Sequence, residues 1–205
     1  AEDGIRDDLV TGVQTCALPI LVEPARDAIE KAVFLNNQEP NYLKLQGDIY
    51  GAAGLTDKAI ASYKRSLKLD SRLVTALNNL GDLYRQQNRK NEARKYLSRA
   101  LANAPDFVPA RFNLAQLLID NGDSEQAEKE LNICIDQAPQ VPDPWFSLVN
   151  IRENTTRGHE AVELMEAAVE ASPDNAQVRL QLIAQYEKSG QVEKAMEHYP
   201  IVDQL

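Results

Sequence analysis

The chain has 205 residues, of which 43% are apolar and 26% charged, and its formal net charge at pH 7 is −9. This composition is typical of a folded globular protein rather than of a disordered chain. The acidic balance argues against nucleic acid as a partner, because phosphate backbones are bound by basic surfaces. Two cysteines cannot form a disulfide framework, two histidines leave little room for a His-rich metal centre, and no run of about eighteen apolar residues could span a membrane.

The first twenty residues form a segment of unusual composition. They read AEDGIRD, then Asp8 and Leu9, then VTGVQTCALPI. The segment resembles a translated high-throughput sequencing adapter in which only positions 8 and 9 vary. It does not fit a secretory signal peptide, which needs a basic start and an unbroken apolar stretch. We therefore expect residues 1–20 to be non-native and base the fold prediction on residues 21–205.

From residue 21 onward the sequence repeats every thirty-four residues. One column of the repeat is always alanine: Ala25, Ala59, Ala93, Ala127, Ala161 and Ala195. A second column is always small: Ala32, Ser66, Ala100, Cys134 and Ala168. A third is always large and apolar: Ile29, Tyr63, Leu97, Leu131, Met165 and Tyr199. A fixed period of this length indicates an array of stacked helical units.

Each repeat is predicted to form two helices joined by a turn. In residues 74–107, helical spacing relates Leu77, Leu80, Gly81 and Tyr84 in the first half. Glycine or asparagine stands where a helix would end in the left-handed conformation, at Gly54, Asn88, Gly122 and Gly190. Proline is expected to end three of the second helices, at Pro105, Pro139 and Pro173.

The predicted organisation is a half unit followed by five units. The half unit covers residues 21–39, and the units cover 40–73, 74–107, 108–141, 142–175 and 176–205. Because residues 22–37 match only the second helix of a unit, we expect the chain to be a fragment of a longer repeat protein. Near the other end, Pro200 is expected to truncate or kink the last helix.

This pattern resembles the tetratricopeptide repeat. Its motif positions in residues 74–107 are Leu77, Leu80, Gly81, Tyr84, Ala93, Leu97, Ala100 and Pro105. Trp145 supplies the motif's tryptophan in the fourth unit, whereas Arg111 and Arg179 replace a large apolar residue and Arg152 replaces the tyrosine. The resemblance implies an all-α fold, an α-solenoid of antiparallel helix pairs that stack into a right-handed superhelix.

Little in the sequence points to catalysis. No nucleophile motif, phosphate-binding loop or zinc-protease motif occurs. His159 and His198 are predicted to be solvated surface side chains, and Cys134 is predicted to be a buried, inert thiol. Solvated helix faces are expected to hold the acidic residues Glu125, Glu128 and Glu130. We therefore expect no enzyme activity, no metal and no cofactor.

The resemblance also implies a concave groove lined by first-helix residues that point away from the paired helix. By register, the groove candidates are Lys44, Asn78, Asn79, Asp82, Phe112, Asn113, Gln116, Phe146 and Asn150, with Asp48, Ser147 and Gln181 on the same face. Asparagine amides suit the backbone of an extended peptide, because they donate and accept hydrogen bonds. Phe112 and Phe146 would contact apolar peptide side chains. The alternative is that these positions are solvated and merely tolerate polarity.

One known subtype of the family makes a more specific prediction. Its chaperone-binding members hold a C-terminal carboxylate with lysine and asparagine on one unit, asparagine on the next, and two cations on the third. Lys44 and Asn79 fit this arrangement, but Asp48 replaces the first asparagine, and Pro109 and Asn113 replace the cations. Since an aspartate repels a carboxylate, we do not expect a carboxylate clamp here.

The leading hypothesis is a protein–protein interaction scaffold that binds an extended or helical peptide segment in its groove. One alternative is the substrate-recruiting or regulatory region of a larger enzyme, for example a glycosyltransferase. Another is a cell-envelope assembly factor. The sequence leaves the compartment open between cytoplasm and periplasm.

Overall fold

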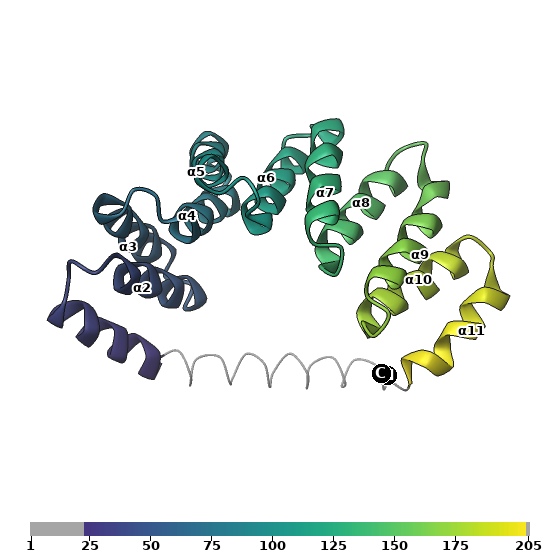
Figure 1. Ribbon diagram of the computed structural model, residues 1–205, viewed down its shortest axis with the longest axis horizontal. Helices are drawn as coiled ribbons and strands as arrows, with labels where there is room; N and C mark the ends of the chain where they lie inside the picture. Colours follow the sequence, from purple (N-terminus) through teal and green to yellow (C-terminus); the bar gives the residue numbers. More distant parts are fainter. Residues whose placement is uncertain (1–22, 204–205) are drawn as a thin grey trace, which may run out of the picture. The chain divides into compact units, whose positions relative to one another are not determined.

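The structure, a computed structural model, describes residues 23–203. Every regular element in this range is a helix, and short turns join consecutive helices (Figure 1). The helices gather into two compact units whose boundary in the sequence lies between Pro105 and Asp106. The all-α class predicted from the sequence is confirmed. The prediction about residues 1–20 lies outside the described residues.

The first unit contains a helical segment at 23–35 and two helix pairs. One pair is α2 (Pro40–Ala52) with α3 (Thr56–Leu69), and the other is α4 (Val74–Gln86) with α5 (Lys90–Asn103). Helix α4 packs against both α5 and α3, so the first helix of one pair covers the second helix of the pair before it.

The second unit contains three helix pairs. They are α6 (Val108–Asp120) with α7 (Ser124–Gln137), α8 (Pro142–Glu153) with α9 (Ala161–Ala171), and α10 (Ala176–Lys188) with α11 (Val192–Val202). A short 3-10 helix, η1 (Gly158–Glu160), precedes α9. Helix α8 also packs against α7, and α10 against α9, which repeats the stacking seen in the first unit.

The turns within the pairs follow the predicted pattern in four cases. The backbone is left-handed at the four predicted positions, with φ of 70° at Gly54, 57° at Asn88, 81° at Gly122 and 77° at Gly190. Glycine adopts this conformation without a Cβ penalty, and asparagine tolerates it better than most residues. The turn between α8 and α9 differs, because Gly158 begins η1 instead of closing α8 in the left-handed conformation.

Prolines end the second helices of three pairs as expected. Helices α5, α7 and α9 end at Asn103, Gln137 and Ala171, each two residues before a proline. Helix α11 is not truncated at Pro200, because it continues through this residue to Val202. Proline has no backbone N–H, so at this position it removes one helical hydrogen bond, the one to the carbonyl of Met196. Met196 lies on the exposed side of the helix, where its side chain is open to solvent.

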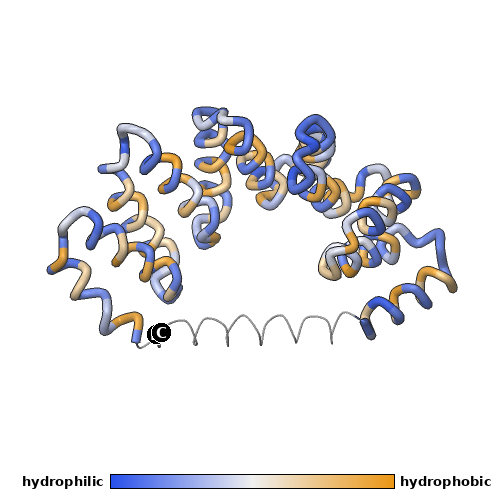
Figure 2. The backbone as a smooth tube through the Cα atoms, turned by 180° about the vertical axis from the view of Figure 1, so that it is seen from behind, coloured by the Kyte–Doolittle hydropathy of each residue, from blue (hydrophilic) through white to orange (hydrophobic). Residues whose placement is uncertain are grey.

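Small residues let the two helices of each pair approach closely. Within the helix pairs the alanine column is fully covered, with Ala59, Ala93 and Ala127 at 0% exposure. At Gly81 of α4, a Cβ would lie only 2.7 Å from Cγ of Leu97 on α5. Apolar residues recur along the helices of both units rather than in one segment (Figure 2). In the second unit the buried residues form two core clusters, one on α6, α7 and α8 and one on α8 to α11.

We predict that Gly81→Ala destabilises the protein by about 1–3 kcal/mol, because the new methyl group overpacks the α4–α5 crossing. Urea unfolding followed by circular dichroism would measure the change. Gly51→Ala is the matched control, since a Cβ on this helical glycine meets nothing within 4 Å. The control is expected to be neutral or to stabilise by up to about 1 kcal/mol. A Gly81→Ala protein as stable as the wild type would contradict the close crossing.

Candidate functional site

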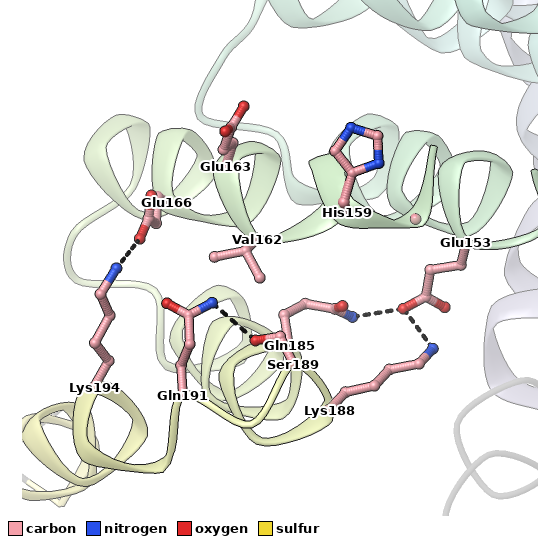
Figure 3. Close-up of a pocket in the computed structure, with 11 residues that line it drawn as sticks. Glu153, His159, Val162, Glu163, Glu166, Gln185, Lys188, Ser189, Gln191 and Lys194 are labelled. Atoms are coloured by element: carbon pink, nitrogen blue, oxygen red, sulfur yellow. Dashed lines mark hydrogen bonds and ion pairs between the residues drawn. The ribbon is translucent and has the colours of Figure 1, made fainter. Parts of the chain in front are cut away.

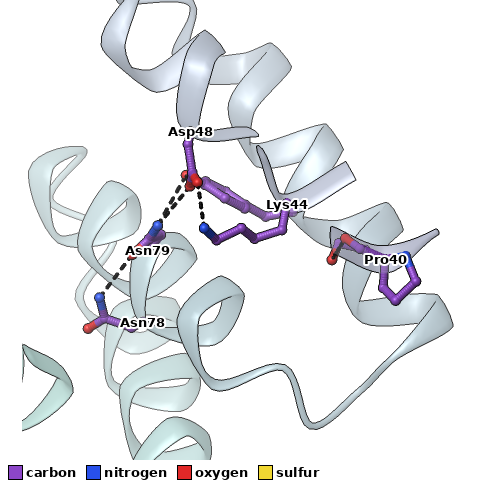
Figure 4. Close-up of polar contacts among 7 residues, drawn as sticks. Pro40, Lys44, Asp48, Asn78 and Asn79 are labelled. Carbon is purple, nitrogen blue, oxygen red and sulfur yellow. Dashed lines mark hydrogen bonds and ion pairs between the residues drawn. The ribbon is translucent and has the colours of Figure 1, made fainter. Parts of the chain in front are cut away.

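On the first-helix face of the first unit, Asp48 is the centre of a hydrogen-bond network (Figure 4). Its Oδ1 accepts hydrogen bonds from the hydroxyl of Tyr63 at 2.7 Å and from Nδ2 of Asn79 at 2.9 Å. Its Oδ2 forms an ion pair with Nζ of Lys44 at 2.7 Å. Burial and the adjacent carboxylate raise the pKa of Tyr63, so the hydroxyl stays protonated and keeps donating.

The other groove candidates of this unit also bond within the protein. Asn78 is only 7% exposed, and its Nδ2 donates to Oδ1 of Asn79 at 2.9 Å. Asp82 accepts from Nη2 of Arg85 at 2.9 Å and from Nε2 of Gln86 at 2.8 Å. Asn78 is therefore mostly covered rather than open on the face, because its amide packs beneath Asn79.

This network also accounts for the departure from the carboxylate-clamp pattern. Lys44 and Asn79 are the two residues that fit the clamp. Asp48 neutralises the charge of Lys44 and accepts a hydrogen bond from the amide of Asn79. The carboxylate of a ligand would be repelled by Asp48, which already binds the nearby donors Lys44 and Asn79.

Three of the five groove candidates of the second unit, Gln116, Phe146 and Asn150, line two hollows along its first helices, whereas Phe112 and Asn113 line neither. One hollow, of about 250 Å³, lies between α6 and α8 and is lined in part by Gln116, Ser147 and Asn150. The other, of about 320 Å³, lies between α8 and α10 and is lined in part by Phe146, Asn150 and Gln181. Because both hollows include Asn150, this side chain stands between them. Nε2 of Gln116 donates to Oγ of Ser147 at 2.8 Å across the first hollow.

The phenylalanines of this face are half-buried rather than fully exposed. Phe112 packs against the core formed by α6, α7 and α8, and Phe146 against the core of the last two pairs. Asn113 is half-buried beside them and has contacts of its own. Sequence analysis missed Leu180, which is 49% exposed and belongs to the same repeat column as Phe112 and Phe146. The thirty-four-residue step was the signal that could have identified it.

A further hollow, of about 580 Å³, lies where α9, η1 and the α10–α11 turn meet (Figure 3). In its wall, Oε1 of Glu153 pairs with Nζ of Lys188 at 2.9 Å, and Oε1 of Glu166 pairs with Nζ of Lys194 at 3.3 Å. The hydrogen bond from Lys188 lowers the pKa of Glu153, so this pair stays charged at neutral pH. His159 is exposed at the rim, as predicted.

The prediction that Glu128 is solvated is wrong. Glu128 is 8% exposed, and its Oε1 lies 2.6 Å from Nη1 of Arg152 and also contacts Arg157. Nε of Arg152 pairs in turn with Oε2 of Glu160 at 2.8 Å. Arg152 occupies the column where three other units have tyrosine and one has leucine, so its charge is buried and requires the carboxylates of α7 and η1.

Arg152→Met should remove the centre of this cluster and leave the buried carboxylate of Glu128 with one cation fewer. We expect a loss of up to about 3 kcal/mol in the free energy of unfolding, since breaking a buried ion pair on one side leaves Glu128 compensated by Arg157 alone. Lys129→Met is the control, because it breaks an exposed pair with Glu125 on the same helix α7. Chemical unfolding of both variants measures the difference, and equal stability of the two would contradict the structural role of Arg152.

His198 also departs from the prediction of a solvated side chain. It is half-buried, its Nδ1 lies 3.2 Å from Nη1 of Arg179, and its ring packs against Tyr186. Burial and the charge of Arg179 lower the pKa of His198, which favours the neutral ring. Arg179 is buried where a large apolar residue was expected, and it donates to the carbonyl of Pro173 at 2.6 Å.

Cys134 lies where the small column places it. Its side chain is 0% exposed, and burial raises the pKa of the thiol to about 11. A thiol with such a pKa contains little thiolate at neutral pH, so the residue is a poor nucleophile.

We predict that Cys134 resists alkylation by iodoacetamide at pH 8 in the folded protein and reacts readily in denaturant. A Cys16→Ser background leaves Cys134 as the single thiol of the chain. Mass spectrometry over time gives the two rates. Raising the pH towards 11 should speed the reaction by increasing the thiolate fraction, and fast labelling of the folded protein at pH 8 would contradict the burial.

A search of residues 23–203 finds no group of three His, Cys, Asp or Glu side chains placed to hold a metal ion. No helix in the same range is long and apolar enough to cross a membrane.

Comparison with known families identifies the repeat. Two tetratricopeptide repeat profiles match residues 44–108 and 91–149, which together exceed half of the chain. The chain belongs to the tetratricopeptide repeat family. Repeats of this family are interaction modules, and the chain is accordingly a protein-interaction scaffold. A search of curated proteins finds no match.

Solved structures share the fold at low sequence identity. PilF of Pseudomonas aeruginosa is 18% identical with a TM-score of 0.72, covering 96% of this chain and 89% of its own. YrrB, described as a tetratricopeptide repeat protein with an unusual peptide-binding site, is 21% identical with a TM-score of 0.61, covering 87% and 92%. Yeast Tom70 is 17% identical with a TM-score of 0.71, and the match covers 88% of this chain but only 39% of Tom70.

Proposed function

We propose that this tetratricopeptide repeat chain binds a peptide segment of another protein along the first-helix face of its second unit. The observation that carries the proposal is the pair of adjoining hollows on α6, α8 and α10. Three residues singled out by register, Gln116, Phe146 and Asn150, line these hollows although they come from two different helices.

The arrangement suits a peptide better than a small cofactor. The hollows hold about 250 and 320 Å³, at or below the lower end of typical small-molecule pockets, which is about 300 Å³. Amide side chains beside partly exposed apolar ones suit a chain that offers backbone groups and side chains together. The description of YrrB as peptide-binding supports this function by analogy of fold.

The groove candidates of the first unit are not part of the proposed site. Lys44, Asn79 and Asp82 are groove candidates by register, but each bonds to a neighbouring side chain of the same unit. A ligand there would have to break those bonds before forming its own, which reduces the net gain of free energy.

The proposal is tested with ligands selected from a random peptide library displayed on phage, using the full chain as bait. Fluorescence polarisation would then measure the affinity of the selected peptides for wild type and Asn150→Ala. We expect Asn150→Ala to weaken binding about three- to tenfold, since one hydrogen bond contributes roughly 0.5–1.5 kcal/mol.

Asn132→Ala is the matched control, because Asn132 is an exposed asparagine on the second helix α7. The control should bind the peptides like the wild type. Equal affinity of all three proteins would place binding elsewhere and would contradict the proposed groove.

A further inference from the structure

Resting on the proposed function, we propose that the hollows on either side of Asn150 bind an uncharged stretch of an extended peptide. One apolar peptide side chain would enter each hollow, and the main chain between them would bond to the amides of Asn150 and Gln116.

The hollow between α6 and α8 contains no charged side chain in its wall. Its wall includes the apolar Ile119 and Ile151 and the neutral polar groups of Gln116, Ser147 and Asn150. A charged peptide side chain entering it would lose hydration without gaining a counter-charge, which is unfavourable. An aliphatic side chain would instead cover the half-buried Ile119 and remove its apolar surface from water, whereas Ile151 is already buried at 5% exposure.

The hollow between α8 and α10 has one charged group, Glu153, and that charge is already neutralised. Oε1 of Glu153 accepts from Nε2 of Gln185 at 2.9 Å and pairs with Nζ of Lys188 at 2.9 Å. The remaining wall includes the half-buried Phe146 and the buried Val149 and Met165, and its other groups are the neutral amides of Asn150, Gln181 and Gln185. This hollow too favours an apolar side chain over a charged one.

Between the hollows, two polar groups have hydrogen-bonding capacity that suits a peptide backbone. Oδ1 of Asn150 accepts from Asn154, and within the described part of the chain no acceptor takes a bond from its Nδ2. Nε2 of Gln116 is engaged with Ser147, and in the same range no donor bonds its Oε1. The pair therefore offers one donor and one acceptor, which match a peptide carbonyl and a peptide N–H.

In the first unit, the same repeat columns hold charged residues at three of four positions. The column that holds Gln116 and Asn150 holds Asp48 and Asp82 earlier in the chain. The column that holds Phe112, Phe146 and Leu180 begins with Lys44 and Asn78. Since the repeat accommodates charge at these positions, the fold does not require them to be neutral in the second unit.

The experiment uses the library-selected peptides and the full chain. We expect the selected sequences to share an uncharged core with at least two apolar residues. Replacing either apolar residue by glutamate, and separately by lysine, should weaken binding at least about tenfold in both cases, because neither hollow offers a counter-charge. Affinity should change little with salt, because the contacts are not ionic.

Asn150→Asp tests the protein side of the same contact. It preserves the size of the side chain, removes the donor and adds a charge beside both hollows, so we expect it to weaken binding more than Asn150→Ala does. Asn132→Asp adds the same charge on the exposed face of α7 and should leave affinity unchanged. Thermal unfolding of both variants would show that each is folded.

The outcomes separate this inference from the proposed function. Selected peptides rich in lysine, arginine, aspartate or glutamate, with an affinity that falls steeply as salt rises, would overturn the uncharged ligand while Asn150→Ala still weakened binding. A charged substitution that leaves affinity intact would do the same. If no peptide is enriched, or if Asn150→Ala binds like the wild type, the proposed function fails and this inference fails with it.

Discussion

The structure depends on the close approach of two helices at small side chains. Gly81 and Ala93 occupy the crossing of α4 and α5, where an added methyl group on Gly81 would lie 2.7 Å from Leu97. This approach brings large apolar residues such as Leu97 into full contact, and that packing stabilises each pair. Stacking of the first helix of one pair on the second helix of the preceding pair then extends the core within each unit.

Much of the fold could be predicted because the packing constraint repeats. A position that must be small at a helix crossing holds a small residue every thirty-four residues. The left-handed turns likewise require glycine or asparagine, at Gly54, Asn88, Gly122 and Gly190. The polar contacts could not be predicted in this way. Glu128 and Arg152 are twenty-four positions apart and belong to no common column, so their burial together depends on the irregular turn before α9.

For the candidate site, the sequence predicted which positions face the groove but not how their side chains are bonded. Register identified Gln116, Phe146 and Asn150, which the fold gathers around two hollows. Register could not show that Asn79 is bound to Asp48, because both side chains look available in the sequence. Competition between ligand and intramolecular partners depends on side-chain conformation, which a repeat pattern does not encode.

The alanine packing column lies on the second helices of the pairs, whereas the surface columns that line the candidate site lie on the first helices. Along the chain the packing column keeps alanine at Ala59, Ala93 and Ala127, whereas one surface column changes from Asp82 to Asn150. Substitutions in the surface column leave the crossings untouched. The ligand specificity of each repeat can therefore change during evolution without loss of the helix packing that stabilises the fold.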